Sequence, residues 1–281
     1  MRNYILATLL LASNCLFAQY WEPKAIYMDK YQVLDSAYIK VTYSLTFVKD
    51  TLKAQQKSND IQVLLIGKKV SKYYSQSYSD YNEYVKSLIK KGADAVPKAK
   101  DGTNGYEIFK NYPADKITVT DMATLIGGNY LYFDDQHNMN WNIRNERTMI
   151  LSYSCQKATT TFRGRTYEAW FATEIPINNG PWKFGGLPGL ILKVSDSLNY
   201  FKFECIGIEH LKKKEPIKYY NLPYIKSTRK ECGKLYRRLH NDFAGFRTMQ
   251  GGKTFEVNTK GEAKEMKNST RKHPYNPIEK E

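Results

Sequence analysis

The feature that most constrains this chain is a glycine- and proline-rich stretch, residues 180–192, with the sequence Gly-Pro-Trp-Lys-Phe-Gly-Gly-Leu-Pro-Gly-Leu-Ile-Leu. Glycine permits positive φ and close backbone approach, whereas proline fixes φ and removes a hydrogen-bond donor. The apolar run from Leu190 to Val194 is typical of a buried strand. A turn this constrained sets the register of the sheet that the strand enters. We therefore expect a structural motif made of Gly186, Leu187, Pro188, Gly189, Leu190 and Ile191.

The first 18 residues have the pattern of a secretory signal peptide. An apolar run from Tyr4 to Ala12 follows a basic residue, and the small residue Ala18 stands at the expected cleavage point, so the mature chain would begin at Gln19. Lipidation at Cys15 is the alternative, but a lipidation site wants a small residue before the cysteine and this chain has asparagine there. We expect a soluble protein that is periplasmic or secreted and has no nucleic-acid partner.

The mature chain is dominated by strand patterns. Residues 38–48 alternate almost perfectly between apolar and polar side chains, which predicts an antiparallel strand with one wet face. A buried strand over 61–66 and a turn at Gly67-Lys68 predict a hairpin into Val70 to Ser75. A second hairpin is expected around Asp196-Ser197. The pattern predicts a mainly β fold, an antiparallel meander curved into a bowl or half-barrel, with closure to a sandwich as the alternative. Further short strands are expected at 106–109, 116–122, 129–133, 141–144, 149–158, 167–173, 190–195 and 200–208.

Two amphipathic helices accompany the strands. Asp80 and Glu83 have the spacing of a capping box ahead of a helix near 81–91, and Thr228 and Glu231 repeat that spacing ahead of a helix near 228–243. Beyond Gly251 the chain is polar and low in apolar residues. The predicted organisation is a signal peptide over 1–18, a β-rich domain over 19–250, and a loosely held, polar and basic C-terminal tail over 251–281.

Two groups of side chains are candidates for ligand contact. Arg163 and Arg165 flank a glycine and have the guanidinium geometry that grips a carboxylate or phosphate, although cationic hairpin tips are also common on solvated surfaces. Trp141, Trp170 and Trp182 offer aromatic faces that suit sugars and lipids, with core packing as the alternative. We expect the curved sheet to present a ligand-sized concavity lined by aromatic residues, with at least one of these tryptophans among them.

Three cysteines remain in the mature chain, so at least one has no partner within it. The alternation over 149–158 places Cys155 on an apolar strand face. It is then a small core residue, one half of a disulfide with Cys205, or a reactive thiol whose pKa Lys157 lowers. Cys232 falls on the apolar stripe of the second helix, and we expect it to stay unpaired.

Catalytic and metal-binding motifs are missing from the sequence. The four histidines are scattered, and no His-Glu-x-x-His, Cys-x-x-Cys or Gly-x-Ser-x-Gly pattern occurs, so we predict no metal and no cofactor. The cluster of Asp134, Asp135, His137 and Glu146 fits a solvated turn better than a site for a hard cation.

The basic charge is uneven, because most of the formal net charge of +15 lies after Leu211. A basic surface on an exported protein is suited to anionic lipid, to lipopolysaccharide phosphates or to an acidic partner. A solvated basic surface is the alternative.

With these residues in view, the chain resembles the GLPGLI family of exported proteins from Bacteroidota, named for the sequence that stands here at 186–191. Part of it is also similar to the bowl-shaped, non-catalytic N-terminal domain of some bacterial peptide-N-glycanases, and the strand order is similar to the open half-barrel of periplasmic lipoprotein carriers. The resemblance carries over no catalytic residue. It extends to Ser71-Lys72-Tyr73-Tyr74-Ser75, Tyr153-x-Cys155-x-Lys157-Ala158, Phe162-Arg163-Gly164-Arg165, Ala169-Trp170, Glu174-Ile175-Pro176, Gly180-Pro181 and Asn276-Pro277-Ile278-Glu279.

We therefore expect a non-enzymatic role, in which the protein holds an apolar ligand, a glycan or a protein partner in the cell envelope. The alternative is an envelope hydrolase or a thiol-dependent enzyme. A strongly perturbed acid or thiol inside the largest concavity would favour the enzyme, whereas an apolar, aromatic-lined bowl would favour binding.

Overall fold

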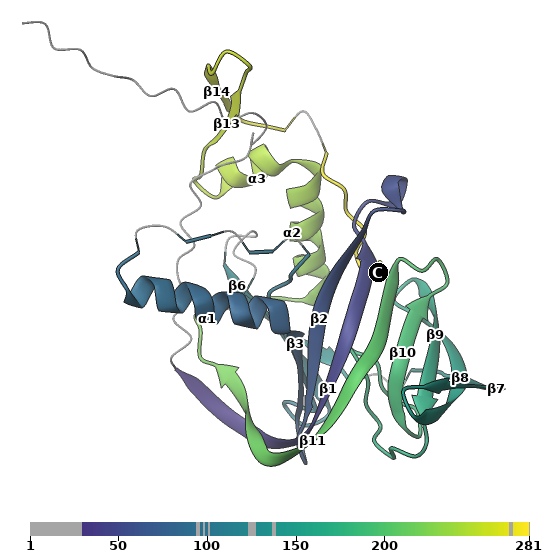
Figure 1. Cartoon of the computed structure of the whole chain (residues 1–281). Helices are drawn as coiled ribbons and strands as arrows, with labels where there is room; N and C mark the ends of the chain where they lie inside the picture. The colour runs from purple at the N-terminus through teal and green to yellow at the C-terminus, as the bar shows by residue number, and fades with distance from the viewer. Residues whose placement is uncertain are drawn as a thin grey trace, which may run out of the picture.

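The computed structural model describes residues 30–93, 96–97, 99–100, 102–122, 128–136, 139–269 and 272–280, so the expected signal peptide lies outside the described residues. Within these ranges the chain forms a mainly β structure with three α-helices (Figure 1). The helices are α1 (Gln76–Lys90), α2 (Arg229–Asn241) and α3 (Phe243–Met249), with a short 3-10 helix at Thr51–Lys53. The strands are β1 (Tyr31–Val48), β2 (Lys57–Ile66), β3 (Ser71–Ser75), β4 (Tyr106–Lys110), β5 (Lys116–Asp121), β6 (Asn129–Asp135), β7 (Asn142–Ile150), β8 (Tyr153–Phe162), β9 (Arg165–Ala172), β10 (Leu190–Asp196), β11 (Phe201–Tyr220), β12 (Tyr224–Lys226), β13 (Thr254–Val257) and β14 (Ala263–Met266).

One large sheet organises the molecule. In the described part of the chain it has 12 strands in the order β12-β6-β5-β4-β3-β2-β1-β11-β10-β9-β8-β7. Neighbouring strands pair antiparallel, except that β12 runs parallel to β6. Two meanders thus extend from the central β1–β11 pair. Because β12 and β7 remain separate edges, the sheet is not a closed barrel, and the predicted antiparallel meander is confirmed.

One face of the sheet is covered by the segment between β9 and β10, residues 173–189. The predicted alternation on β1 is confirmed, because every second residue from Ile39 to Leu45 is buried. These side chains share one hydrophobic core with Trp182, Phe184 and Leu187 of the covering segment. Burying a large apolar side chain of this kind stabilises the fold by about 1.5–3 kcal/mol. The apolar face of the sheet is therefore filled largely by the chain itself.

The outer halves of β1 and β11 form a ribbon that bends away from the rest of the sheet and runs beneath α1 (Figure 1). Pairing along the ribbon begins at Tyr31 with Tyr220, and register shifts interrupt it on both sides of Ala37. Such irregularities bend a strand pair and increase its twist. The ribbon contributes Ala37 and Ile217 to a second, smaller core on the other face of the sheet, together with Val63, Leu65, Val70 and Phe109.

Helix α1 begins earlier than the sequence predicted. Its N-cap is Ser75, whose side-chain oxygen accepts a hydrogen bond from the Tyr78 backbone N–H at 3.0 Å. The predicted capping box at Asp80 is wrong, because the Asp80 carboxylate accepts a hydrogen bond from the Gln76 side chain inside the first turns instead. Serine at the end of β3 supplies a better cap, since it is already in an extended conformation.

The capping box at the start of α2 is confirmed. The Thr228 side chain accepts from the Glu231 backbone N–H, and the Glu231 carboxylate accepts in return from the Thr228 backbone N–H. The predicted second helix is nevertheless two helices. Asp242 ends α2 and caps α3 by accepting from the Gly245 backbone N–H at 2.9 Å, so Phe243 belongs to α3.

The region predicted as one strand over 149–158 is a tight hairpin between β7 and β8. Leu151 has φ 53, a left-handed conformation that ends the strand, and Met149 and Leu151 are exposed rather than aligned with Cys155. The next turn is as predicted: Arg163 and Gly164 have φ 50 and 73, which matches a two-residue turn between β8 and β9.

Candidate functional site

The glycine- and proline-rich stretch is held by the core. Gly186 has φ 90, a region that disfavours side chains. Gly189 has a different constraint, because a Cβ there would clash with the Ala172 carbonyl oxygen on β9. At the start of β10 the Tyr43 hydroxyl donates to the Ile191 carbonyl oxygen at 2.7 Å. These contacts make the stretch part of the framework.

A buried lysine lies under the same stretch. Lys110 Nζ donates to Asn179 Oδ1 at 2.9 Å and to the carbonyl oxygens of Gly180 and Phe184, each at 2.7 Å. Burial lowers the pKa of Lys110 to about 7. All three acceptors are neutral. These hydrogen bonds therefore link β4 to the segment between β9 and β10 without involving a carboxylate.

Arg165 is internal and binds the C-terminal segment. Its guanidinium lies 2.9 Å from the Asp196 carboxylate and donates to the carbonyl oxygens of Pro277 and Ile278 at 2.6 and 3.1 Å. It also donates to Asn276 Oδ1 at 2.6 Å. The expectation of a loosely held tail is therefore wrong for residues 276–279, because their carbonyl and amide oxygens satisfy a buried cation.

The neighbouring charged groups complete this anchorage. Lys183 Nζ lies 3.1 Å from Asp134 Oδ2 and 2.8 Å from Glu279 Oε1, and Arg163 lies 2.9 Å from Asp134 Oδ1. The Tyr132 hydroxyl is a further partner of Lys183 at 3.3 Å. We call Arg163, Arg165, Lys183, Asp134, Asp196 and Glu279 the C-terminal anchor. The two arginines predicted from sequence are thus brought together, but around the chain's own residues.

The three tryptophans do not gather at one surface. Trp182 is buried, with its ring centroid 5.1 Å from that of Phe184. Trp141 is half-buried near the same phenylalanine and donates through Nε1 to the Gly185 carbonyl oxygen at 2.8 Å. Trp170 lies apart, where its Nε1 donates to Glu168 at 2.9 Å.

All three described cysteines are buried free thiols. Burial raises the pKa of both Cys155 and Cys205 to about 11. Of the three possibilities for Cys155, the structure shows the small core residue, and Cys232 is unpaired as expected. Lys157 does not activate Cys155, because its ammonium pairs with Glu168 at 2.8 Å.

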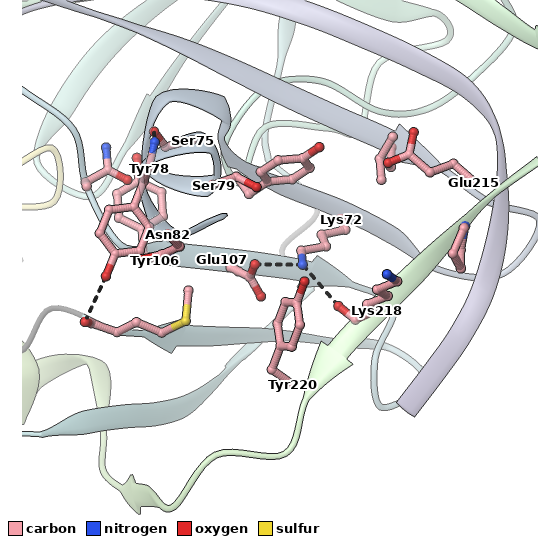
Figure 2. A pocket seen from close by; sticks show the side chains of 15 residues that line it. Lys72, Ser75, Tyr78, Ser79, Asn82, Tyr106, Glu107, Glu215, Lys218 and Tyr220 are labelled. Atoms are coloured by element: carbon pink, nitrogen blue, oxygen red, sulfur yellow. Dashed lines mark hydrogen bonds and ion pairs between the residues drawn. The ribbon is translucent and has the colours of Figure 1, made fainter. Parts of the chain in front are cut away.

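A cavity of about 170 Å³ lies between α1, the β3–β4 pair and the bent ribbon of β1 and β11 (Figure 2). We call it the Lys72 pocket. As far as the described residues define its lining, it includes none of the arginines and tryptophans predicted from sequence. Its lining residues are Leu65, Lys72, Tyr74, Ser75, Tyr78, Ser79, Asn82, Asn104, Tyr106, Glu107, Met122, Glu215, Pro216, Lys218 and Tyr220.

The centre of the Lys72 pocket is a buried ion pair between β3 and β4. Lys72 Nζ lies 2.6 Å from Glu107 Oε1 and donates to the Lys218 carbonyl oxygen at 3.0 Å. The two residues are only 5% and 6% exposed, and Glu107 Oε2 has no hydrogen-bond partner among the described residues. Burial raises the pKa of Glu107, although Lys72 acts in the opposite direction. A buried carboxylate with a spare acceptor is costly unless something else satisfies it.

Aromatic rings surround the ammonium of Lys72. Its Nζ lies 5.3 Å from the ring centroid of Tyr74, 5.2 Å from that of Phe109 and 5.0 Å from that of Tyr220. Desolvation raises the pKa of Tyr220 to about 12, so its hydroxyl stays neutral at ordinary pH. Figure 2 shows the Glu107 carboxylate and the Tyr220 side chain beside the Lys72 ammonium.

Asp35 fixes the ribbon that closes the pocket. Its carboxylate accepts hydrogen bonds from the backbone N–H groups of Ser36, Lys69 and Val70 at 2.7, 2.6 and 3.0 Å. Burial acts to raise the pKa of Asp35, but these hydrogen bonds hold it below its ordinary value. The β2–β3 turn is thereby tied to β1, beside the start of β3 and Lys72.

Sequence reasoning did not identify this pocket. Its polar centre combines Lys72 and Glu107 with Tyr220, which are far apart in the chain, and no local spacing relates them. The available signal was the segment Ser71-Lys72-Tyr73-Tyr74-Ser75, which carried part of the resemblance and supplies Lys72, Tyr74 and Ser75 to the lining.

Comparisons with known proteins relate this chain to one family of domains. A family model described as "N-glycanase peptide, N-terminal domain" matches residues 105–229. Two solved structures of PNGF-II, in P21 and C2 space groups, are similar with TM-scores of 0.47 and 0.46 at 14% and 13% identity. They cover 73% and 72% of this chain, which spans only 34% and 33% of theirs. The search of curated proteins found no match.

The described part of the chain contains no cluster of three or more His, Cys, Asp or Glu residues suited to a metal ion. Within the predicted acidic turn, Asp134 belongs to the C-terminal anchor and Asp135 pairs with Lys116 at 2.5 Å, while His137 lies outside the described residues. None of the described helices has both the length and the apolar character to span a bilayer.

Proposed function

We propose that this protein is a non-enzymatic binding module of the cell envelope and that the Lys72 pocket is its ligand site. The observation that carries the proposal is Glu107, which lines a cavity and whose Oε2 is a buried acceptor without a partner among the described residues. Buried polar groups are almost always satisfied, and an unsatisfied one beside a cavity suits a ligand that donates a hydrogen bond.

The character of the pocket narrows the ligand classes expected from sequence. An apolar ligand would leave Glu107 Oε2 unsatisfied, and a protein partner would have to insert a side chain beneath α1. A small polar ligand meets neither difficulty. The matching family model, described as "N-glycanase peptide, N-terminal domain", adds a reason to include glycans among the candidates.

Mass spectrometry of molecules that co-purify with the protein from its native envelope tests the proposal. Ser79 on α1 lines the cavity, so Ser79→Phe fills it, whereas Ser87→Phe places the same side chain two turns further along the helix and outside the lining. We expect a bound small molecule in the wild type and in Ser87→Phe, and its loss from Ser79→Phe. Equal recovery from all three proteins, or no bound molecule in the wild type, would contradict the proposal.

An envelope hydrolase remains the second candidate, and one observation favours it. The raised pKa of Glu107 is a property of general acids, and Glu215 is a second carboxyl group in the same lining. Release of p-nitrophenol from p-nitrophenyl glycosides, lost in Glu107→Gln, would support this alternative. A thiol enzyme is disfavoured, because thiols with a pKa of about 11 carry little thiolate at neutral pH.

The proposal extends to the family of the chain, its cellular location and its basic surface. We propose that the chain is a member of the GLPGLI family, exported by its first 18 residues to the periplasm or cell surface. The exposed lysines at 212–214 on β11 belong to the basic C-terminal region that we propose as a contact for anionic lipid. Cosedimentation with vesicles containing anionic lipid, compared with zwitterionic vesicles and at raised salt, tests that contact.

A further inference from the structure

The charges that line the Lys72 pocket balance. The lining residues include two lysines, Lys72 and Lys218, and two glutamates, Glu107 and Glu215, so their formal charge sums to zero. A charged ligand would therefore enter a partly desolvated site without a spare counterion, which is unfavourable. The balance favours a ligand that is neutral but rich in hydrogen-bonding groups.

The hydrogen-bonding groups around the cavity suit a ligand that carries hydroxyl groups, because a hydroxyl can both donate and accept a hydrogen bond. Glu107 Oε2 requires a donor, and an O–H···carboxylate bond is roughly twice as strong as a neutral one. The Lys72 ammonium has three N–H donors and two acceptors among the described residues, Glu107 Oε1 and the Lys218 carbonyl oxygen. A molecule with adjacent hydroxyl groups can donate to the carboxylate and accept from the ammonium at the same time.

The walls and the volume of the cavity define the shape of this ligand. Tyr74, Tyr78, Tyr106 and Tyr220 supply aromatic surfaces, which give apolar contact to C–H groups. A cavity of about 150 Å³ is known to hold benzene. The Lys72 pocket, at about 170 Å³, thus has room for one six-membered ring.

We propose that the Lys72 pocket holds one neutral sugar ring, oriented by a hydroxyl that donates to the Glu107 carboxylate. This inference rests on the proposed function and specifies its ligand. The sugar ring is either a free monosaccharide or the end residue of a glycan, since both present the same hydroxyls to the pocket.

Isothermal titration calorimetry with defined probes tests this assignment. The neutral probes are glucose, galactose, mannose and N-acetylglucosamine, each as the free sugar and as the methyl glycoside that represents a glycan end. Glucosamine and glucuronate are the charged probes, and cyclohexanol is the apolar ring. We expect at least one neutral sugar to bind with a lower Kd than the charged and apolar probes. Preference for the methyl glycoside identifies a glycan end, and preference for the free sugar identifies a monosaccharide.

Two variants connect the binding to the pocket. Glu107→Gln alone leaves Lys72 buried without its counterion, so the charge-free pair Lys72→Met with Glu107→Gln is the safer test of the hydrogen bond. We expect it to raise Kd for the neutral sugar at least tenfold, because a hydrogen bond to a charged group is lost. Tyr220→Leu removes an aromatic wall while keeping both members of the ion pair and should also raise Kd, whereas Ser87→Phe should leave it unchanged.

The failures of this inference and of the proposed function are distinguishable. Preferred binding of cyclohexanol, glucosamine or glucuronate, abolished by Ser79→Phe, would overturn the sugar assignment and leave the pocket as a ligand site. Neutral-sugar binding that survives both Ser79→Phe and the charge-free pair would also overturn it, because the sugar would then bind elsewhere. Absence of binding by every probe overturns the inference, while the co-purification experiment judges the proposed function separately.

Discussion

The C-terminal anchor and the Lys72 pocket both bury a lysine against carboxylates, but they differ in how completely those charges are satisfied. Lys183 meets two carboxylates and the Tyr132 hydroxyl. Lys72 meets one carboxylate, whose second oxygen has no partner among the described residues, and both residues line a cavity. The comparison teaches that burial of charge alone does not indicate a functional site. The combination of an incomplete partner set with a cavity is the reason that we propose the Lys72 pocket as one.

The largest expected effect on stability is at the C-terminal anchor. Arg165→Met leaves Asp196 buried without its cation and releases residues 276–278, and breaking such a pair costs about 3–5 kcal/mol. Chemical denaturation measures the loss in unfolding free energy. Arg144→Met on the exposed strand β7 is the matched control and should change it by less than about 0.5 kcal/mol. Equal small effects would mean that the anchor contributes little to stability.

The next largest effect on stability is expected in the glycine- and proline-rich stretch, which carries Lys183. Gly189→Ala places a methyl group against the Ala172 carbonyl oxygen and should cost about 1–3 kcal/mol. Gly186→Ala meets an unfavourable φ without such a clash and should cost about 1 kcal/mol. Gly207→Ala, where a Cβ would meet open space, is the control in the same melting experiments. If Gly186→Ala proved the more damaging, backbone conformation would matter more than close approach.

A third prediction uses Lys110, whose acceptors are all neutral. Its pKa in the fold is about 7, below its unfolded value, so between those values the unfolded chain binds more protons than the folded one. The contribution of this group to stability should therefore increase as pH rises from about 7 toward 9. Urea denaturation across this range should show a steeper increase for the wild type than for Lys110→Met. Identical slopes would show that the three carbonyl oxygens keep the amine protonated.

The smallest effect on stability is expected at the pocket. Replacing both charges together, with Lys72→Met and Glu107→Gln, removes a buried pair without leaving an unpaired charge, so unfolding free energy should change by no more than about 1 kcal/mol. Glu107→Gln alone should cost more. A loss from the double variant as large as that of Arg165→Met would make the pair structural and remove the distinction between the two regions.

Local rules predicted much of the sheet and little of the site. The alternation on β1, the Thr228–Glu231 capping box and the glycine turn at Gly164 are decided by neighbouring residues, and all three could be read in sequence. The Leu151 turn could not, because an apolar residue in a left-handed conformation gives no signal. The pocket depends on bulges that bend β1 over β3 and β4, and these have no sequence signature here. Arg165 was recognised as an oxygen-binding residue, but its ligand proved to be the chain itself.

The anchor also has a consequence for the order in which the fold is completed. Arg165 and its partner, the Ile278 carbonyl oxygen, are 113 residues apart in the chain, and Lys183 and Glu279 are 96 residues apart. During synthesis, β9 and the covering segment are therefore present long before the groups that satisfy their cations. The core has no complete set of charges until residues 276–279 have been synthesised, so a chain that lacks them retains buried cations that favour opening. Completion of this sheet is thus coupled to a segment that lies far along the chain from the strands it stabilises.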